Sequence, residues 1–444
     1  MAYSSWLERL GLHRRELRAW AYYDVANSAF MTTVLMIFPV YFVRVPAAGL
    51  AAEVARSRFA FATSLAVVLV GLLGPFLGAV ADYRGSKKAF LAAFLALGAS
   101  ATAALALATE GRWAFALVAF VVANVGVTST LAFYNALLPA IASESEVDRV
   151  STAGFAMGYL GGGVLLALNL WMISSPATFG LPDEGSATRL AFASVAVWWA
   201  LFAIPLFRHV KEPPPRAEAG EGKGGEGVLR IALRRLAGSV RELRHFRDAG
   251  FLLLAFLIYN DAVNTIIRMA TTYGDEIGIP ASHMMLTLLM VQLVGVPFAF
   301  AFGLLADRIG TKRAIFVSLA VYAGISVYAF ALRTPAQFFV LGFLVGTVQG
   351  GAQALARSLF ATLIPRHKAG EMFGFFGVFD RFGGAIGSFV FGVMLAATGS
   401  SRPALLTLVV FFALGALLLS RVDVVRGRRL AREAEAAAQE AGAP

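Results

Sequence analysis

The sequence has no cysteine and only five histidines among its 444 residues. Without cysteine the chain forms no disulfide bond and has no thiol chemistry. The histidines are dispersed and lie near the ends of apolar stretches, which predicts no metal-binding cluster; they are His13, His209, His245, His283 and His367. The phosphate-binding motif G-x-x-x-x-G-K-S/T is also absent from the sequence, which argues against ATP as an energy source. We therefore expect no metal, no cofactor and no enzyme activity.

Charged residues are scarce as well. They make up 15% of the chain, whereas a soluble protein typically carries about 25%. A helix that crosses a bilayer needs about 20 mostly apolar residues, and the sequence contains twelve such stretches: 20–43, 59–81, 89–109, 113–137, 152–174, 189–207, 249–273, 284–306, 314–332, 336–359, 372–398 and 403–421. We therefore predict an all-α integral membrane protein with twelve transmembrane helices.

The positive charge follows the predicted topology. A net charge of +11 could indicate nucleic-acid binding, but its distribution argues against this. If the N-terminus is cytoplasmic, 28 of the 38 Lys and Arg residues fall on the cytoplasmic side, and only Arg268, Arg357 and Arg381 fall within the apolar stretches. This is the positive-inside pattern. We expect a multi-pass protein of the cell inner membrane with both termini in the cytoplasm, in contact with lipid and not with nucleic acid.

A polar stretch divides the chain in two. Residues 210–227 are rich in Pro, Gly and Glu and cannot bury enough apolar surface to fold. Residues 229–243 then place aliphatic side chains on one face and arginines elsewhere, which indicates a basic amphipathic helix on the inner leaflet, or alternatively a helix that binds a partner. We expect six-helix bundles at 1–208 and 249–421, a linker at 209–248, and a cytoplasmic tail at 422–444 that forms a frayed polar helix.

The two halves of the chain repeat each other. GAVADYRGSKK (78–88) aligns with GLLADRIGTKR (303–313), so that Gly78, Asp82, Gly85 and Lys87 correspond to Gly303, Asp307, Gly310 and Lys312. The stretches YYDVANSAF (22–30) and IYNDAVNTII (258–267) share the pattern D-x-x-N-S/T. Duplication of a six-helix unit is typical of transporters whose halves rock about a site near the middle of the membrane.

These motifs resemble a known superfamily. The doubled pattern G-x-x-x-D-x-x-G-x-K/R-K/R resembles the signature loop of the major facilitator superfamily, and the resemblance covers the whole chain. Within it, the chain resembles the vacuole effluxer-like family in YYDVANSAF, in residues 134–163 and in GGAQALARSLFATLIP (350–365), although that family often has Trp where this chain has Val25. The resemblance implies two pseudo-symmetric bundles with segments 1, 4, 7 and 10 around a central cavity. Eukaryotic members export amino acids from the vacuole.

The resemblance also implies a cytoplasmic gate. Asp82 and Asp307 stand at the C-terminal ends of their segments, where the helix dipole favours cations. Each is expected to cap a helix of the opposite half, near Met372 for Asp82 and near Ser151 for Asp307; the alternative is local neutralisation by nearby basic residues. Gly85 and Gly310 would supply the positive φ of the turns. The assigned gate comprises Asp82, Gly85, Lys87, Arg149, Asp307, Gly310, Lys312 and Arg357.

Polar residues inside the apolar stretches indicate a pathway, because such residues usually face a cavity. Asp261 shares a helix face with Arg268, about 10 Å along the axis, and this pair suits a zwitterion. The alternative is a structural polar network. The assigned pathway comprises Asp24, Asn27, Asn124, Thr128, Asp261, Asn264, Thr265, Arg268, Gln349 and Gln353. The adjacent Asp380 and Arg381 are expected to form structural ion pairs.

The sequence therefore predicts a secondary active transporter, and not an enzyme. We expect a monomer that moves a small polar organic solute, such as an amino acid, and couples this movement to a proton or sodium gradient. A cation-coupled sugar symporter is an alternative, because such proteins also tend to carry an Asp early in the first segment. A receptor or scaffold with a transporter fold is a third, but it would not need the duplicated polar sites.

Overall fold

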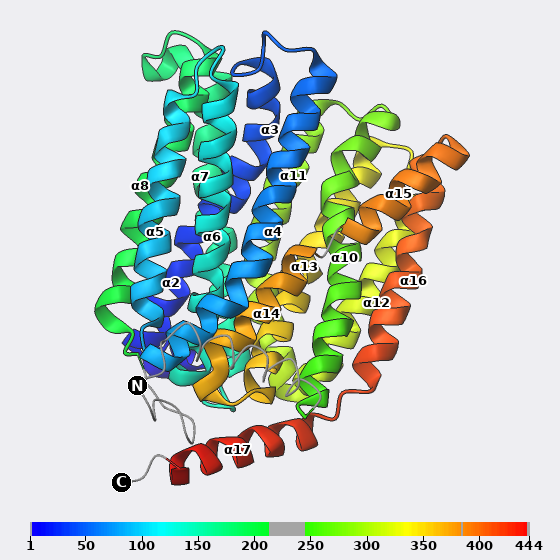
Figure 1. The fold of residues 1–444 in the computed structure, drawn as a ribbon. Helices are drawn as coiled ribbons and strands as arrows, with labels where there is room; N and C mark the ends of the chain where they lie inside the picture. The colour runs from blue at the N-terminus through cyan, green and yellow to red at the C-terminus, as the bar shows by residue number, and fades with distance from the viewer. Residues whose placement is uncertain (1, 213–244, 383–384, 442–444) are drawn as a thin grey trace.

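The computed structural model describes residues 2–212, 245–382 and 385–441, and this part of the chain is almost entirely helical. Twelve of its helical segments are long and apolar enough to cross a membrane, as the sequence predicts. Six precede the linker and six follow it, and both termini lie at the same end of the bundle, called the lower end after its place in Figure 1. The expected amphipathic helix at 229–243 lies outside the described residues.

The first six membrane segments form the N-half. A short helix, α1 (Ala2–Arg9), precedes them. The segments are α2 (Arg15–Ala29) continued by the π-helical turn η1 (Phe30–Val34) and α3 (Leu35–Arg44); α4 (Ala52–Arg84); α5 (Lys87–Ala104) with η2 (Leu105–Leu107); α6 (Trp113–Ile141); α7 (Val147–Ser174); and α8 (Glu184–His209). The short helix η3 (Pro176–Phe179) joins α7 to α8. The last helix of the N-half, α8, ends at His209.

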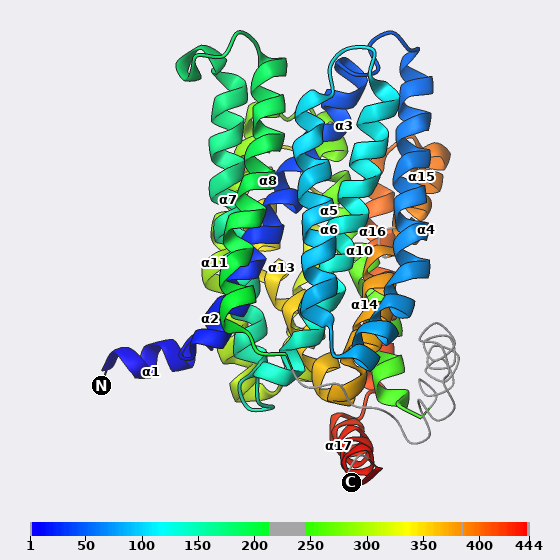
Figure 2. The same ribbon diagram turned by 60° about the vertical axis from the view of Figure 1, so that its left-hand side comes forward.

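The last six membrane segments form the C-half. They are α10 (Arg247–Glu276); α11 (Ala281–Ile309); α12 (Thr311–Phe330); α13 (Pro335–Leu363); η4 (Arg366–Lys368) with α14 (Ala369–Phe382) and α15 (Ala385–Thr398); and α16 (Ser401–Ser420). The eleventh segment is described in two parts, α14 and α15, on either side of residues 383–384, which lie outside the described residues. A final helix, α17 (Val424–Ala441), runs across the lower end (Figures 1 and 2).

Most helices extend beyond the predicted apolar stretches because polar residues begin them. Asp183 accepts a hydrogen bond of 2.6 Å from the backbone N–H of Ser186 and so caps α8. Thr334 and Gln337 form a reciprocal capping box at the start of α13, followed by a proline in the first turn. Such polar turns can lie in the headgroup region, so apolar composition alone underestimates helix length.

The halves are joined at the lower end. There α4 packs against α14, and α7 packs against α11. The neighbouring helix α15 instead packs against α10 and α16 of its own half, and its ribbon diverges from α4 toward the upper end (Figure 1). On the side of α4 and α14 the two halves therefore meet closely below and diverge above, whereas α7 keeps contact with α11 up to Gly163 and Gln292.

Glycine makes the lower contact possible. A Cβ atom on Gly78 would overlap the backbone carbonyl of Gly370, and one on Gly74 would lie 3.5 Å from the carbonyl oxygen of Gly374. Gly303, the repeat counterpart of Gly78, meets Thr152 in the same way. The glycine shared by the two repeated motifs thus lets helices of opposite halves approach closely.

Replacing Gly78 with alanine tests this packing. The added methyl group must displace the backbone of α14, so we expect Gly78→Ala to destabilise the protein by about 1–3 kcal/mol. The matched control is Gly324→Ala on α12, where a Cβ atom would meet no other atom within 4 Å. Better helix propensity should leave that control unchanged or stabilise it by up to about 1 kcal/mol. Thermal unfolding in lipid nanodiscs measures both, and equal shifts would disprove the close contact.

Candidate functional site

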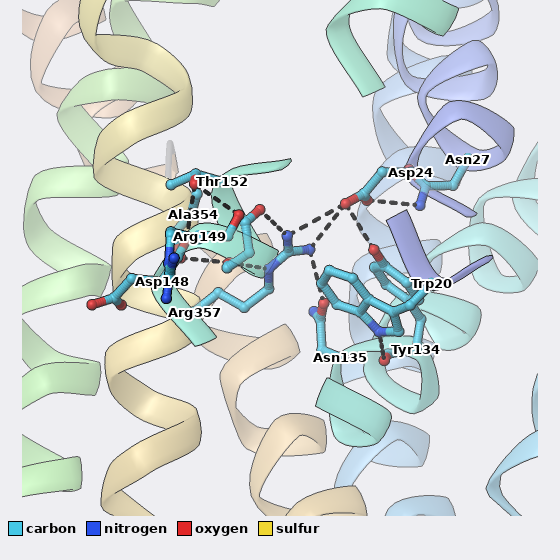
Figure 3. A network of polar contacts seen from close by, with 11 residues as sticks. Trp20, Asp24, Asn27, Tyr134, Asn135, Asp148, Arg149, Thr152, Ala354 and Arg357 are labelled. Carbon is cyan, nitrogen blue, oxygen red and sulfur yellow. Dashed lines mark hydrogen bonds and ion pairs between the residues drawn. The ribbon is translucent and has the colours of Figure 1, made fainter. Parts of the chain in front are cut away.

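A buried ion pair joins the two halves. Asp24 on α2 and Arg357 on α13 are only 6% and 4% exposed. The two terminal guanidinium nitrogens of Arg357 lie 3.3 and 3.4 Å from Oδ2 of Asp24 (Figure 3). The sequence analysis placed Asp24 in the pathway and Arg357 in the gate, and the structure makes them one unit.

The remaining donors of Arg357 also bind the N-half. Its Nε donates to Oγ of Ser151 at 2.9 Å, one terminal nitrogen donates to the carbonyl oxygen of Ser151 at 2.8 Å, and the other donates to Oδ1 of Asn135 at 3.2 Å. The hydroxyl of Ser151 donates in turn to the carbonyl oxygen of Ala354. A C-half arginine is therefore fully paired inside the N-half, and separating the halves would remove all of these partners.

Aromatic rings surround this ion pair. The guanidinium carbon of Arg357 lies 4.7 Å from the ring centre of Trp20 and 4.6 Å from that of Phe155, a cation–π arrangement. Tyr134 stacks on Trp20, and its hydroxyl donates to Oδ2 of Asp24 at 2.8 Å (Figure 3). The motifs YYDVANSAF and YNALLP thus meet at this site, because the first supplies the carboxylate and the second supplies the hydroxyl.

Two glycines of α7 leave room for the pair. A Cβ atom on Gly154 would overlap the carboxylate of Asp24 and would lie 3.0 Å from a guanidinium nitrogen of Arg357. A Cβ atom on Gly158 would lie 2.6 Å from Oγ of Ser28. Asn27 lies beside the site and donates from Nδ2 to Oδ1 of Asp24 at 3.3 Å. The close approach of α2 to α7 therefore depends on small residues.

Asp82 lies where the gate hypothesis placed it. It is 3% exposed and accepts hydrogen bonds from the backbone N–H groups of Gly370 (3.0 Å) and Glu371 (2.8 Å) in the first turn of α14. This satisfies amides that have no partner within their own helix, at the end where the dipole favours an anion. Nζ of Lys87 also lies 2.6 Å from Oδ1 of Asp82. Asp82 therefore both caps a helix of the opposite half and forms an ion pair with a nearby lysine of its own half.

Asp307 does not repeat this arrangement, which corrects the expectation of a symmetric cap near Ser151. It is exposed, and it approaches the start of α7 through an ion pair of 3.3 Å with Nε of Arg149. The cross-half contact at this position comes from Asp148 of α7, which accepts hydrogen bonds from Thr311 (2.6 Å) and Ser358 (2.5 Å). Here the half-buried carboxylate that crosses between the halves belongs to the N-half, because Arg149 already holds Asp307 in an ion pair.

The two signature loops share another contact. Nζ of Lys88 donates to backbone carbonyls at the end of α8, and Nζ of Lys312 donates to backbone carbonyls at the end of α16. Sequence alignment pairs Lys312 with Lys87, but the contacts make Lys88 its counterpart. Gly85 and Gly310 both have positive φ, 59° and 89°, as expected for these turns.

Asp261 also differs from its sequence counterpart Asp24. It is 1% exposed and accepts a hydrogen bond from the backbone N–H of Gly387, in the first turn of α15. Thr265 is buried beside it, whereas Arg268 on the same helix is exposed. Asp24 reaches across to the opposite half, while Asp261 binds a helix of its own half. The expectation that these two carboxylates line one central cavity is therefore not supported by their contacts.

A polar chain connects three C-half helices. Nε2 of Gln353 donates to Oδ1 of Asn260 at 2.9 Å, and Nδ2 of Asn260 donates to Oδ1 of Asp380 at 2.9 Å. The sequence analysis missed Asn260, although it directly precedes Asp261. Asp380 thus has a structural hydrogen bond. Among the described residues, the hydrogen bond of Arg381 is the one that a terminal guanidinium nitrogen donates to the sulfur of Met31, at 3.9 Å.

The other predicted pathway residues are dispersed. Asn124 and Thr128 are buried on α6 and lie 3.4 Å from each other, while Asn264 is half-buried. Gln349 lines a cavity of about 80 Å³ between the halves, to which the N-half contributes Met36 and Leu166. Most of the cavity wall is apolar, so Gln349 is one of its few polar groups.

The tail helix α17 docks on the lower end, which corrects the expectation of a frayed helix. Arg426 forms two hydrogen bonds to Asp248 of the C-half, at 2.7 and 2.8 Å. Arg432 forms two to Glu144 of the N-half and holds the pKa of that carboxyl below its usual value. The helix therefore bridges both halves in this closed arrangement.

Comparison with known proteins gives one family. The family model described as "Vacuole effluxer Atg22 like" matches residues 43–432. An uncharacterised MFS-type transporter, YxiO of Bacillus subtilis, is 32% identical over 418 residues, which cover 92% of this chain and 95% of that protein. Autophagy-related protein 22-1 of Neosartorya fischeri is 24% identical over 66% of this chain, and the match spans about half (51%) of that protein.

Solved structures share the fold at low sequence identity. The human organic anion transporter MFSD10 has a TM-score of 0.68 at 14% identity and covers 91% of this chain and 99% of its own. The proton:xylose symporter XylE, bound to 6-bromo-6-deoxy-D-glucose, has a TM-score of 0.67 at 15% identity, with coverage of 95% and 96%. FucP in the outward conformation has a TM-score of 0.66 at 15% identity, with coverage of 92% and 100%. All three show the major facilitator fold.

A double-mutant cycle measures the central ion pair. Asp24→Asn leaves the buried guanidinium of Arg357 without an anion, which should cost about 3–5 kcal/mol. Arg357→Gln should also destabilise the protein, and the double variant should lose less than the sum of the two. The exposed pair Arg429–Glu433 serves as control, with an expected coupling of about 0–1 kcal/mol. Thermal unfolding in lipid nanodiscs gives the four values, and strictly additive losses at Asp24 and Arg357 would contradict a direct pair.

Proposed function

The chain belongs to the vacuole effluxer Atg22-like family of the major facilitator superfamily, and we propose that it is a secondary active transporter of a small polar organic solute, coupled to the proton gradient. The observation that carries this proposal is the buried Asp24–Arg357 pair between the halves. The electrostatic attraction within this pair depends on the single negative charge of Asp24. One proton on that carboxylate can therefore weaken the contact that keeps the lower end closed.

The distribution of basic residues supports the orientation. The lower end carries the signature loops and both termini (Figure 1), and most of the Lys and Arg residues that the structure describes lie at or near it. By the positive-inside rule this end is cytoplasmic. The structure then corresponds to a state closed toward the cytoplasm and separated on the outside. Binding from outside, followed by rocking of the halves, is the expected transport step in the cell inner membrane, and we expect one chain to suffice.

The surroundings of Asp24 favour a proton over sodium as the coupling ion. Its carboxylate receives donors from Arg357, Tyr134 and Asn27. A hard cation needs several oxygen ligands, whereas these neighbours present mostly N–H and O–H groups. Protonation instead removes the charge of Asp24 and loosens its hold on Arg357. Sodium coupling remains the alternative outcome of the test.

The solute class rests on the family and on the polar groups of the C-half. Small amino acids are the first candidates, because charges of both signs, on Arg268, Asp380 and Arg381, lie in membrane segments. A sugar is the second candidate, since one structural neighbour is a proton:xylose symporter. A non-transporting receptor is disfavoured, because it would not need a buried charge pair at the contact between the two halves.

Flux into proteoliposomes tests the coupling. Labelled amino acids and sugars should reveal a solute whose accumulation follows an imposed pH gradient and not a sodium gradient. Asp24→Asn should abolish this accumulation but retain solute exchange, because the substitution removes the titrating group and keeps its size. Wild-type accumulation in Asp24→Asn, or accumulation driven by sodium alone, would refute proton coupling through this residue.

A milder variant covers the case in which Asp24→Asn is too unstable to reconstitute. Tyr134→Phe removes one hydrogen-bond donor from Asp24 and so changes the surroundings of the carboxylate in the ion pair. The pH profile of accumulation should therefore differ from that of the wild-type protein. Tyr23→Phe is the matched control, because Tyr23 packs against Tyr134 and accepts a hydrogen bond from Trp199. An unchanged pH profile in Tyr134→Phe would count against the role of Asp24.

A further inference from the structure

A cavity lies between the two halves, above the ion pair. It has a volume of about 80 Å³, and the N-half contributes Met36 of α3 and Leu166 of α7 to its wall. The C-half supplies the rest of the wall from α10, α11 and α13, including Ile266 and Gln349. Gln349 precedes Arg357 by eight residues on α13, which places it about 12 Å further toward the upper end. The cavity is therefore separate from the ion pair that closes the lower end.

The wall of this cavity is uncharged. The described residues that line it are apolar or neutral, and Arg268 of α10, which is exposed, is not among them. A charged group that entered such a cavity would lose its hydration without gaining a counter-charge, which costs more than the burial of a neutral group. The cavity therefore selects against carboxylates and ammonium groups and favours a neutral ligand.

Three polar side chains belong to the wall, and two of them are available to a ligand. The hydroxyl of Thr287 donates to the carbonyl oxygen of His283 at 2.8 Å, within its own helix. The carboxamides of Gln292 and Gln349 make no hydrogen bond to another residue in the described part of the chain. Each carboxamide has an oxygen that accepts and an NH₂ group that donates. A ligand with one amide or hydroxyl group matches them, because such a group both donates and accepts.

The dimensions of the cavity depend on the relative position of the halves. Beside it, α7 and α11 are in close contact, since a Cβ atom on Gly163 would lie 3.2 Å from Cβ of Gln292. Rocking of the halves would move Met36 and Leu166 relative to α10, α11 and α13. A molecule that fills the cavity contacts both halves in their present arrangement. It therefore binds this arrangement more tightly than one in which the two walls have moved.

We propose that this cavity binds a small uncharged amphiphile, which has an apolar body the size of about one ring and a single amide or hydroxyl group held by Gln292 and Gln349. The volume has room for several groups of the size of a water molecule, which fits one ring with a short polar group. Such a ligand holds the halves in the present arrangement and so slows the movement of solute. The inference goes beyond the proposed function, because it concerns a molecule that blocks rocking and not the solute that is carried.

A series of ligands that share one aromatic ring tests the site. The probes are benzamide, toluene, benzoate and benzylamine, which is protonated at neutral pH, each titrated into the whole protein in lipid nanodiscs at equal ionic strength. A ligand of this size should bind with a dissociation constant of about 1 mM. Benzamide should raise the unfolding temperature most, toluene less, and the two ions not at all. No shift with benzamide, or an equal shift with benzoate, would overturn the proposal.

Two variants and two matched controls assign the effect to the cavity. Gln349→Met removes a carboxamide and keeps the length of the side chain, so benzamide should bind about three- to tenfold more weakly while toluene binds at least as well. Ala270→Leu, at a half-buried residue of the wall, fills part of the volume and should weaken both ligands. Gln439→Met on α17 and Ala301→Leu on α11 change exposed residues outside the wall, and both should bind as the wild type. Equal weakening of both ligands in Gln349→Met, or unchanged benzamide binding in Ala270→Leu, would refute the site.

The site and the transport function can fail separately. In proteoliposomes, benzamide should lower the flux of a transported solute in the wild type and lower it less in Ala270→Leu, each relative to its own flux without benzamide. Flux that stays unchanged at a benzamide concentration that saturates the thermal shift would refute the blocking role. Proton-driven flux in a protein that does not bind benzamide would refute the site and keep the transporter. Binding that follows the expected series, in a protein without flux of any solute, would keep the site and refute the transporter.

Discussion

The burial of a charge pair between two separable halves is the constraint on which the closed end depends. Asp24 and Arg357 are held in a protein interior where an unpaired charge is expensive. The halves can therefore part at this level only if the carboxylate gains a proton or the guanidinium gains another anion. The capping of α14 by Asp82 and the bridge made by α17 also stabilise the closed end. Breaking either contact would not leave a deeply buried arginine without an anionic partner.

The duplicated motifs perform different tasks in the two halves. Asp24 packs against glycines of α7 and pairs across the interface, whereas Asp261 packs against Gly387 of α15 and accepts a hydrogen bond from its backbone N–H. The signature-loop carboxylates diverge in the same way, since Asp82 is buried and Asp307 is exposed. Gene duplication thus supplied equivalent positions, and the two sets of neighbouring side chains gave them different chemistry. The charge that moves during transport is expected in the N-half.

The sequence was sufficient for the architecture and for part of the site. Apolar stretches predict twelve spans because lipid imposes a minimum length, and the resemblance of the repeated loop to the superfamily signature implies the contact of Asp82 with α14. Contacts between residues far apart in the sequence could not be predicted. Arg357 and Asp24 are separated by 333 positions in the chain, and no local sequence pattern indicates that they form an ion pair. Asn260 was overlooked because its neighbour Asp261 carries the repeated motif. The docking of α17 depends on tertiary contacts, which composition does not reveal.

Distance measurement between spin labels at the lower end tests the central claim most directly, and the lack of cysteine makes every introduced label site unique. Ala89 at the start of α5 and Arg313 at the start of α12 are exposed positions on opposite halves. With both replaced by labelled cysteine, the wild-type background should give a short, narrow distance distribution at neutral pH that lengthens on acidification. Asp24→Asn should give the longer distances already at neutral pH, while the control Asp380→Asn should not. Identical, pH-independent distributions in the wild-type and Asp24→Asn backgrounds would contradict the view that this ion pair holds the halves together.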